Sequence, residues 1–250
     1  MMTSKELRER AWAKLGGGNW LKAVGAFCLF WLMGEVASQL VARVGVATGG
    51  IVNMSLGDFV REYGETFRQM GMEMPSDLPT EMRGISLPVT QPWYQAIQFV
   101  VTTFARGVLL AGWTVFAVAV MRDGANALQV FSGFPRFLEM GWLMLLRAIR
   151  IMLWSLLLIV PGFVAFYAYR MAFFLKADHP EWSAWHVLAE SKRMMQGHKW
   201  RLACLDASFI GWLLLVLATF GLAALIVNPY MGVTYAAFYE ELLDRNEDLP

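Results

Sequence analysis

The stretch from Ser191 to Glu240 constrains the fold more than any other part of the chain. It begins with a basic segment that ends at Gly197, continues as a long apolar run to Phe220, and is interrupted by Asn228-Pro229 before a Tyr-rich end. About 20 apolar residues in a helix cross the roughly 30 Å hydrocarbon core of a bilayer. The pattern therefore predicts a surface helix, a turn at the membrane interface and a hairpin through the bilayer.

The composition also indicates a membrane protein. Of the 250 residues, 57% are hydrophobic and 16% are charged, whereas soluble domains are about 45–50% apolar and about 25% charged. The net charge of +1 excludes a globally basic nucleic-acid binder. The first 18 residues are too polar for the core of a cleavable signal peptide. We therefore expect an integral membrane protein that contacts membrane lipids and no nucleic acid.

Further apolar segments have the length of a membrane span or slightly less. Long runs cover residues 20–46, 93–120 and 141–160. The segments 163–176 and 230–243 are shorter, about 21 Å each as helices. Each of these two is either a short tilted span or a re-entrant segment, which is tolerated where protein covers its polar ends.

The distribution of Lys and Arg decides between single kinked helices and hairpins. With the N-terminus in the cytoplasm, the acidic loop 47–91 falls outside and Arg122 and Arg136 fall inside. A single crossing by residues 141–176 would then place the basic residues at 192–201 outside. Cytoplasmic loops carry an excess of Lys and Arg, so hairpins, which return this segment to the cytoplasm, are favoured.

We therefore expect an all-α fold, a polytopic membrane helical bundle with about six transmembrane or re-entrant segments. They form three in-out-in hairpins with both termini in the cytoplasm. The second and third hairpins turn at Pro161-Gly162 and Asn228-Pro229, because Pro and Gly interrupt apolar runs at these places.

Amphipathic helices complete the expected single membrane domain, residues 1–250. Residues 1–18 form a cytoplasmic helix, which lies either in the headgroup region or in solvent. Loop 47–91 is an outer loop whose amphipathic helix ends at Gly71 and lies either on the membrane or in a solvated cap. Residues 177–199 form a cytoplasmic interfacial helix.

Several charged residues lie inside the apolar segments. An unpaired ionised group in hydrocarbon is costly, so such a group faces the bundle or forms a pair. At 1.5 Å per residue, Glu35 and Arg106 lie about 22 and 24 Å from the inner surface, and Asp206 and Arg170 about 9 Å. Arg150 lies about 12 Å deep. We therefore predict the pairs Glu35–Arg106 and Asp206 with Arg170 or Arg150.

A basic cluster precedes the last long apolar run, and it consists of Lys192, Arg193, Lys199, Trp200 and Arg201. Each cation near an anionic membrane surface contributes about 1 kcal/mol of attraction. These residues are therefore candidates for contact with lipid headgroups. The alternative is ordinary charge that sets the topology.

Catalytic motifs are absent from the sequence. It contains no His-Glu-x-x-His, no Gly-x-Ser-x-Gly and no phosphate-binding loop. The three histidines, His179, His186 and His198, lack metal-ligand spacing on a common face. Cys28 and Cys204 lie in apolar runs, where free buried thiols are the expected state and a disulfide between them is the alternative. We expect no catalytic residue, no metal site and no cofactor.

The second half of the chain carries a distinctive set of aromatic, glycine, proline and charged residues. They are Pro161-Gly162, Tyr167, Tyr169-Arg170, Ala177-Asp178, Pro180, Ser191, Met194-Met195, Gly197, Lys199-Trp200-Arg201, Asp206, Ser208 to Trp212, Pro229-Tyr230, Thr234 and Ala237 to Leu242. With these residues the chain resembles the bacterial "domain of unknown function 975" family of integral membrane proteins. The resemblance implies a multi-pass protein of the bacterial cytoplasmic (inner) membrane, and it implies no activity.

Two classes of function fit these observations. The first is a non-enzymatic interaction, accessory or lipid-contacting component, since no soluble domain and no catalytic constellation is evident. Its partners would be membrane lipids, with a membrane protein or a second copy of the chain. The alternative is a transporter, or a component of one, for a small molecule or lipid, which would use the broken hairpins and the intramembrane charges. A membrane-embedded enzyme is a third class.

Overall fold

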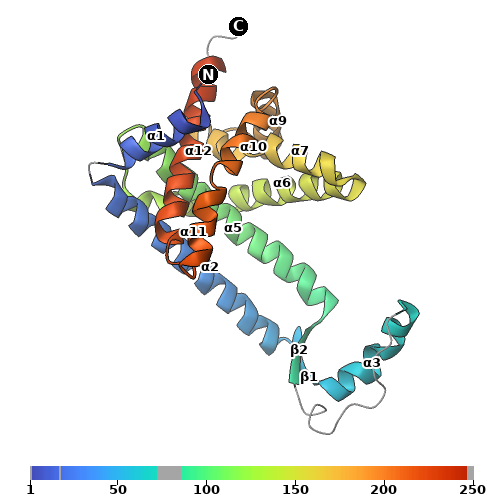
Figure 1. Ribbon diagram of the computed structural model, residues 1–250. Helices are drawn as coiled ribbons and strands as arrows, with labels where there is room; N and C mark the ends of the chain where they lie inside the picture. Colours follow the sequence, from blue (N-terminus) through green and yellow to red (C-terminus); the bar gives the residue numbers. More distant parts are fainter. Residues whose placement is uncertain (1, 17, 72–85, 247–250) are drawn as a thin grey trace. The chain divides into compact units, whose positions relative to one another are not determined.

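The computed structural model describes residues 2–16, 18–71 and 86–246, and the fold is all-α with one two-stranded ribbon (Figure 1). The chain forms two compact units. The main unit contains residues 1–36 and 103–250, and the loop unit contains residues 37–102. Residues 37–102 pack mainly against one another, and the single membrane domain expected from the sequence stays a prediction.

The helices follow the expected apolar segments, with more breaks than the sequence predicted. In chain order they are α1 (Ser4–Leu15), α2 (Asn19–Ala47), α3 (Leu56–Gln69), α5 (Pro92–Met121), the 3₁₀ helix η1 (Ala127–Arg136), α6 (Phe137–Leu157), α7 (Ile159–Ala168), α8 (Ala172–Asp178), α9 (Ala184–Met194), α10 (Lys199–Ala207), α11 (Ile210–Ala218) and α12 (Ala224–Asn246).

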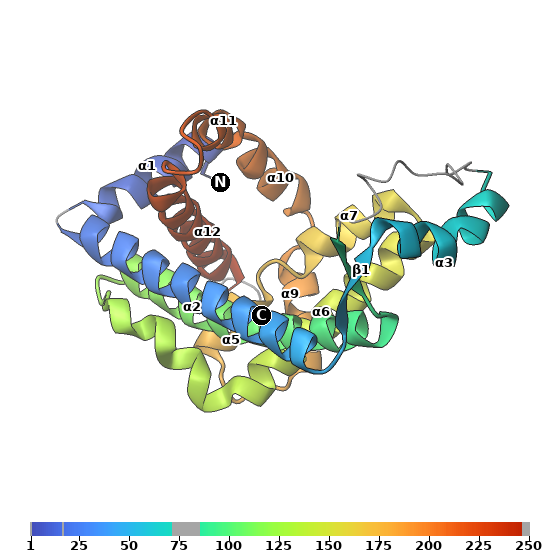
Figure 2. The ribbon, with the colours of Figure 1, turned by 90° about the horizontal axis from the view of Figure 1, so that it is seen from below.

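Helix α1 packs on protein rather than lying free at the surface. It begins with a capping box between Thr3 and Glu6. Its apolar stripe, Leu7, Ala11 and Leu15, is fully buried. Both ribbon views place α1 beside α12 (Figures 1 and 2). The stripe therefore faces the interior of the main unit, and whether the other faces of α1 meet lipid headgroups or solvent stays a prediction.

The second hairpin joins α6 to α7, and its turn lies at Leu158 rather than at Pro161-Gly162. Pro161 belongs to the first turn of α7, where a missing N–H costs little. A Cβ on Gly162 would lie 2.3 Å from the Ser155 hydroxyl. Gly162 is therefore needed for the close approach of the two helices, and the predicted turn was wrong by three residues.

The third hairpin joins α11 to α12, and it turns at Phe220 and Gly221. Both residues have positive φ, 50° and 91°, a conformation that glycine adopts without strain. Asn228-Pro229 lies inside α12, so the predicted turn there was wrong. A proline inside a helix loses one backbone hydrogen bond, and packing of the surrounding helix offsets this loss.

Four helical stretches are long and apolar enough to cross a membrane within the described residues, namely Asn19–Ala47, Pro92–Met121, Ala127–Leu157 and Lys199–Ala218. These stretches agree with the long apolar runs of the sequence. Helices α7 and α12 do not meet the same length and hydropathy criteria. The count of six segments therefore stays a prediction.

Large apolar side chains are exposed around the turns of the second and third hairpins. The most exposed are Leu156, Leu157, Leu158, Val160 and Phe163 in the second, and Leu217, Phe220 and Leu222 in the third. Phe220 is 99% exposed. Soluble proteins rarely expose contiguous apolar patches of this kind, whereas a surface in contact with lipid requires them.

The loop unit contains a short antiparallel ribbon that the sequence did not predict. Strand β1 (Ile51–Ser55) pairs with β2 (Ser86–Thr90), with Ile51 opposite Thr90. Pro88 lies in β2, which a two-stranded ribbon tolerates because each strand has a free edge. Helix α3 is amphipathic, as predicted, and Gly71 follows it with a φ of 78°. Residues 72–85, with the predicted irregular segment, lie outside the described residues.

Close packing between α5 and η1 depends on Gly112. A Cβ at this position would lie 1.7 Å from the carbonyl oxygen of Val130. We expect Gly112→Ala to destabilise the protein by about 1–3 kcal/mol through overpacking. At roughly 2–4 °C per kcal/mol for a chain of this size, its melting temperature in detergent should fall by several degrees.

The control is Gly25→Ala in α2, where a Cβ would meet nothing within 4 Å. Alanine has a higher helix propensity than glycine. This variant should therefore melt at the wild-type temperature or slightly above it. Equal melting of the Gly112 and Gly25 variants would contradict the packing argument.

Candidate functional site

Charged residues gather at the ends of the hairpins opposite their turns, which we call the hairpin bases. Each base is joined by an ion pair. Lys14, at the end of α1, pairs with Asp123, which follows α5. Lys176 of α8 pairs with Glu139 of α6, and Arg201 of α10 pairs with Glu241 of α12. All three pairs lie in the main unit.

Arg122 connects the three bases to one another. Its Nη1 and Nη2 atoms donate to the two carboxylate oxygens of Asp178 at 2.8 and 2.9 Å, and its Nε donates to Glu240 at 2.9 Å. The Tyr239 hydroxyl donates to the same Asp178 carboxylate at 2.9 Å. The hydrogen bonds that Arg122 donates, chiefly those to Asp178, raise the pKa of Arg122. The bases therefore form one structural network whose carboxylates are engaged.

The predicted headgroup cluster divides into engaged and exposed residues. Arg201 donates to Glu241 and to the carbonyl of Met2, so its side chain is committed to the protein. Arg193 pairs with Glu190 on the surface of α9. Lys192 and Trp200 are exposed, and Lys199 is half-buried. Contact of the cluster with lipid headgroups stays a prediction, except that Arg201 is engaged within the fold.

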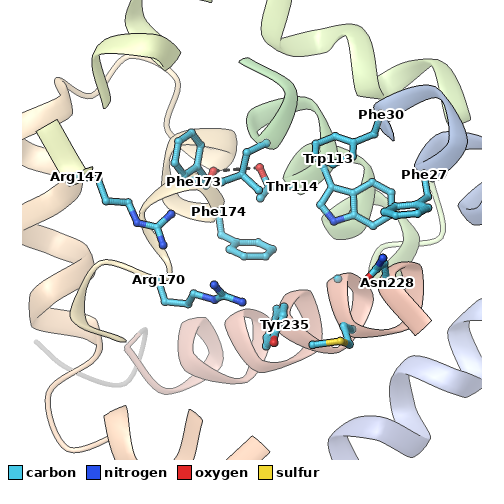
Figure 3. A pocket seen from close by; sticks show the side chains of 13 residues that line it. Phe27, Phe30, Trp113, Thr114, Arg147, Arg170, Phe173, Phe174, Asn228 and Tyr235 are labelled. Carbon is cyan, nitrogen blue, oxygen red and sulfur yellow. Dashed lines mark hydrogen bonds between the residues drawn. The ribbon is translucent and has the colours of Figure 1, made fainter. Parts of the chain in front are cut away.

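A cavity of about 430 Å³ lies inside the main unit (Figure 3). Helices α2, α5, α6, α8 and α12 and the α7–α8 connection contribute to its wall. The lining residues are Phe27, Phe30, Leu110, Trp113, Thr114, Arg147, Arg170, Phe173, Phe174, Asn228, Met231, Gly232 and Tyr235. The wall is thus mainly aromatic and aliphatic, with two cationic side chains and no carboxylate among its lining residues.

Arg147 is the more buried of the two cations, with 7% of its surface exposed. It belongs to the buried face of α6, together with Leu143 and Leu146. Its guanidinium lies 5.9 Å from the centre of the Phe173 ring. Within the described part of the chain, its Nε atom has no hydrogen-bond partner.

Arg170 lies in the connection between α7 and α8. Its guanidinium stacks on Tyr235 at 4.5 Å and lies 5.3 Å from the Phe166 ring centre. The Tyr235 hydroxyl donates to Asp206 at 2.7 Å. Arg170 and Asp206 thus contact the same tyrosine and form no ion pair with each other among the described residues.

The alternative partner for Asp206 was Arg150, and the structure places it elsewhere. Its guanidinium stacks on Trp185 at 4.6 Å and on Tyr169 at 5.6 Å. The predicted Asp206 pairs were therefore wrong, because aromatic rings take the place of the carboxylate beside both arginines. Glu35 and Arg106 are both exposed on the described chain, and their pairing stays a prediction.

Within the described part of the chain, the histidines and cysteines do not come together in a common site. His179 stacks on Trp182 at 3.9 Å. Burial, and next the charge of Arg201, lower the pKa of His198. Cys28 and Cys204 are free, as predicted, but both are exposed rather than buried. In the described ranges, no three His, Cys, Asp or Glu side chains come together in a way that could hold a metal ion.

The two-arginine cavity is therefore the candidate site. Guanidinium groups bind phosphate and carboxylate through paired hydrogen bonds, and an apolar wall accommodates hydrocarbon. The sequence singled out Arg170 for a different role and did not single out Arg147. Arg147 is distinguished by its place on the buried face of α6. The sequence alone does not show which face of α6 is buried, because this depends on the helices that pack against it.

The fold defines a class of helical proteins whose long apolar helices suggest a membrane location. Residues 156–246 match the model of a family described as "Protein of unknown function (DUF975)". The match agrees with the resemblance carried by the second half of the sequence. No curated protein and no solved structure gives a significant match.

The most buried ion pair, Arg201–Glu241, should dominate the stability of the bases, since the two side chains are 16% and 8% exposed. Removing one partner of a buried pair costs about 3–5 kcal/mol. We expect Glu241→Gln to lower the melting temperature in detergent strongly. Glu190→Gln, which breaks the exposed pair with Arg193, serves as the control and should change it little. Comparable losses would contradict this assignment.

Arg147 should reduce the stability of the purified protein. A buried donor without a partner costs about 1–3 kcal/mol, whereas its stacking on Phe173 contributes roughly 0.5–2 kcal/mol. We expect Arg147→Met, which fills similar space without a charge, to leave the melting temperature unchanged or raise it by a few degrees. A large decrease would indicate a structural role instead.

Proposed function

We propose that the protein is a non-enzymatic, lipid-contacting component of the bacterial cytoplasmic membrane. In this proposal the chain crosses the bilayer as three in-out-in hairpins with both termini in the cytoplasm. The proposal rests on one observation, the separation of apolar and charged side chains along the second and third hairpins. Exposed apolar side chains surround the turns at Leu158 and Phe220, and ion pairs occupy the bases.

The contacts at the bases support the hairpin topology. Lys14 and Asp123 are neighbours, and the Arg122 beside them also contacts Asp178 and Glu240. Segments at the start, middle and end of the chain therefore belong to one side of the membrane in this proposal. The excess of Lys and Arg in the same segments assigns that side to the cytoplasm.

A transporter is the second candidate function, and the two-arginine cavity favours it. The cavity lies among broken helices, as the substrate sites of many transporters do. Flux of an anionic solute into liposomes that contain the purified chain would distinguish the two functions. A lipid-contacting component gives no flux above empty liposomes, whereas a transporter gives saturable flux.

Single-cysteine labelling in cells tests the topology. Because Cys28 and Cys204 are exposed, both are first replaced by serine. A membrane-impermeant maleimide should label Tyr63→Cys, in the outer loop, without permeabilisation. It should label His186→Cys only after the cells are permeabilised, because α9 lies on the cytoplasmic side in the proposed topology.

Two labelling results with these variants would contradict the proposal. Labelling of position 186 from outside would reject the three-hairpin topology. If position 63 is labelled only after the cells are permeabilised, the proposed orientation is reversed or wrong.

A further inference from the structure

We infer that the two-arginine cavity binds the anionic group of an amphiphile, with Arg147 and Arg170 contacting a phosphate or carboxylate and the apolar wall contacting its hydrocarbon chain. This inference rests on the proposed function, because it requires a protein that contacts lipid. It adds a specific site and a chemical class of ligand.

The state of Arg147 is the first argument. A guanidinium is always charged and offers five donors. Arg147 is 7% exposed, and its Nε atom lacks a partner among the described residues. Buried charges in proteins are normally paired or hydrogen-bonded. The ion-pair partner missing from the described chain is therefore supplied by an anion in the cavity that Arg147 lines.

The second argument is the presence of Arg170 on the same cavity. Two cations that face one small space repel each other, and an anion between them relieves this repulsion. Asp206 contacts the same tyrosine as Arg170, and its carboxylate accepts from the Tyr235 hydroxyl rather than from either arginine. Figure 3 shows both guanidinium groups on one side of the cavity, opposite Phe27 and Trp113. The positive charge is thus available to a ligand.

The third argument concerns the rest of the ligand. Ligand cavities range over about 300–1,000 Å³, and this one is about 430 Å³. Its wall away from the arginines is formed by aromatic and aliphatic side chains such as Phe27, Trp113 and Phe174. A free inorganic anion leaves this wall without contacts, whereas an alkyl chain attached to the anion fills it. The geometry therefore favours an amphiphile over a free phosphate.

Binding of dodecyl phosphate to the full chain in dodecyl maltoside micelles tests the inference. Calorimetric titration gives the affinity, with the ligand expressed as its mole fraction in the micelle. We expect Arg147→Met and Arg170→Met each to weaken binding about tenfold or more, the value typical of one hydrogen-bonded charge. Melting of each variant without ligand verifies that it is folded.

Arg150→Met is the matched control. Arg150 lies on α6, three residues after Arg147, and stacks on Trp185 and Tyr169 outside the cavity. This variant should bind dodecyl phosphate like the wild type. An equal loss in all three variants would mean general charge attraction and would overturn the site. Wild-type affinity in both cavity variants would also overturn it.

Inorganic phosphate and dodecanol separate the two halves of the ligand. We expect dodecyl phosphate to bind at least tenfold more tightly than either. If inorganic phosphate binds as tightly, the site takes a free anion and the amphiphile assignment is overturned. If dodecanol binds as tightly, the assignment of an anionic group to the ligand is overturned. The labelling experiment is independent of these titrations, so failure of the site and failure of the proposed membrane topology give different results.

Discussion

The interaction on which the rest of the structure depends is the set of contacts that Arg122 makes between hairpin bases. Each hairpin is joined at its base by an ion pair, and Arg122 connects the base of the first to those of the second and third through Asp178 and Glu240. Lipid contributes no hydrophobic attraction between helices in a bilayer. In the proposed topology these polar contacts lie outside the hydrocarbon and help to hold the hairpins together, and the apolar cavity lies among helices that they join.

The cavity follows from the same arrangement. Helices α2, α5, α6, α8 and α12 surround it, and the short, broken α7 and α8 bring Arg170 to its edge. A continuous helix through residues 169–171 would have placed this side chain differently. The breaks that make α7 too short for an ordinary span thus also create the position from which Arg170 faces the cavity. The break between α7 and α8 therefore shapes both the fold and the candidate site.

The sequence predicted the long helices well because apolar length is a local property. The runs at 20–46 and 93–120 became α2 and α5 almost unchanged. The turns were less predictable, since Pro161 and Pro229 are tolerated inside helices once neighbouring helices pack against them, and Gly221 provides the third turn. The β1–β2 ribbon was missed because its strands are short and depend on pairing between distant segments.

The site was predicted only in part, because its members come together through packing. Depth counting identified Arg170, Arg150 and Asp206 as intramembrane charges and assumed that opposite charges at similar depth pair directly. The structure instead uses Tyr235, Tyr169 and Trp185 as neighbours of these groups. Aromatic rings can accept a guanidinium on their faces, and composition alone does not specify which ring a given arginine meets.

The central claim is that the apolar sides of the hairpins lie in the bilayer while the bases lie in water. Spin labels at Leu153 and Leu214, which are exposed on α6 and α11, measure this most directly in the chain reconstituted into liposomes, through their collision rates with oxygen and with a water-soluble nickel complex. The account predicts that both positions collide with oxygen and are shielded from nickel, whereas a label at Glu190 collides with nickel. Ready access of nickel to both Leu153 and Leu214 would contradict it.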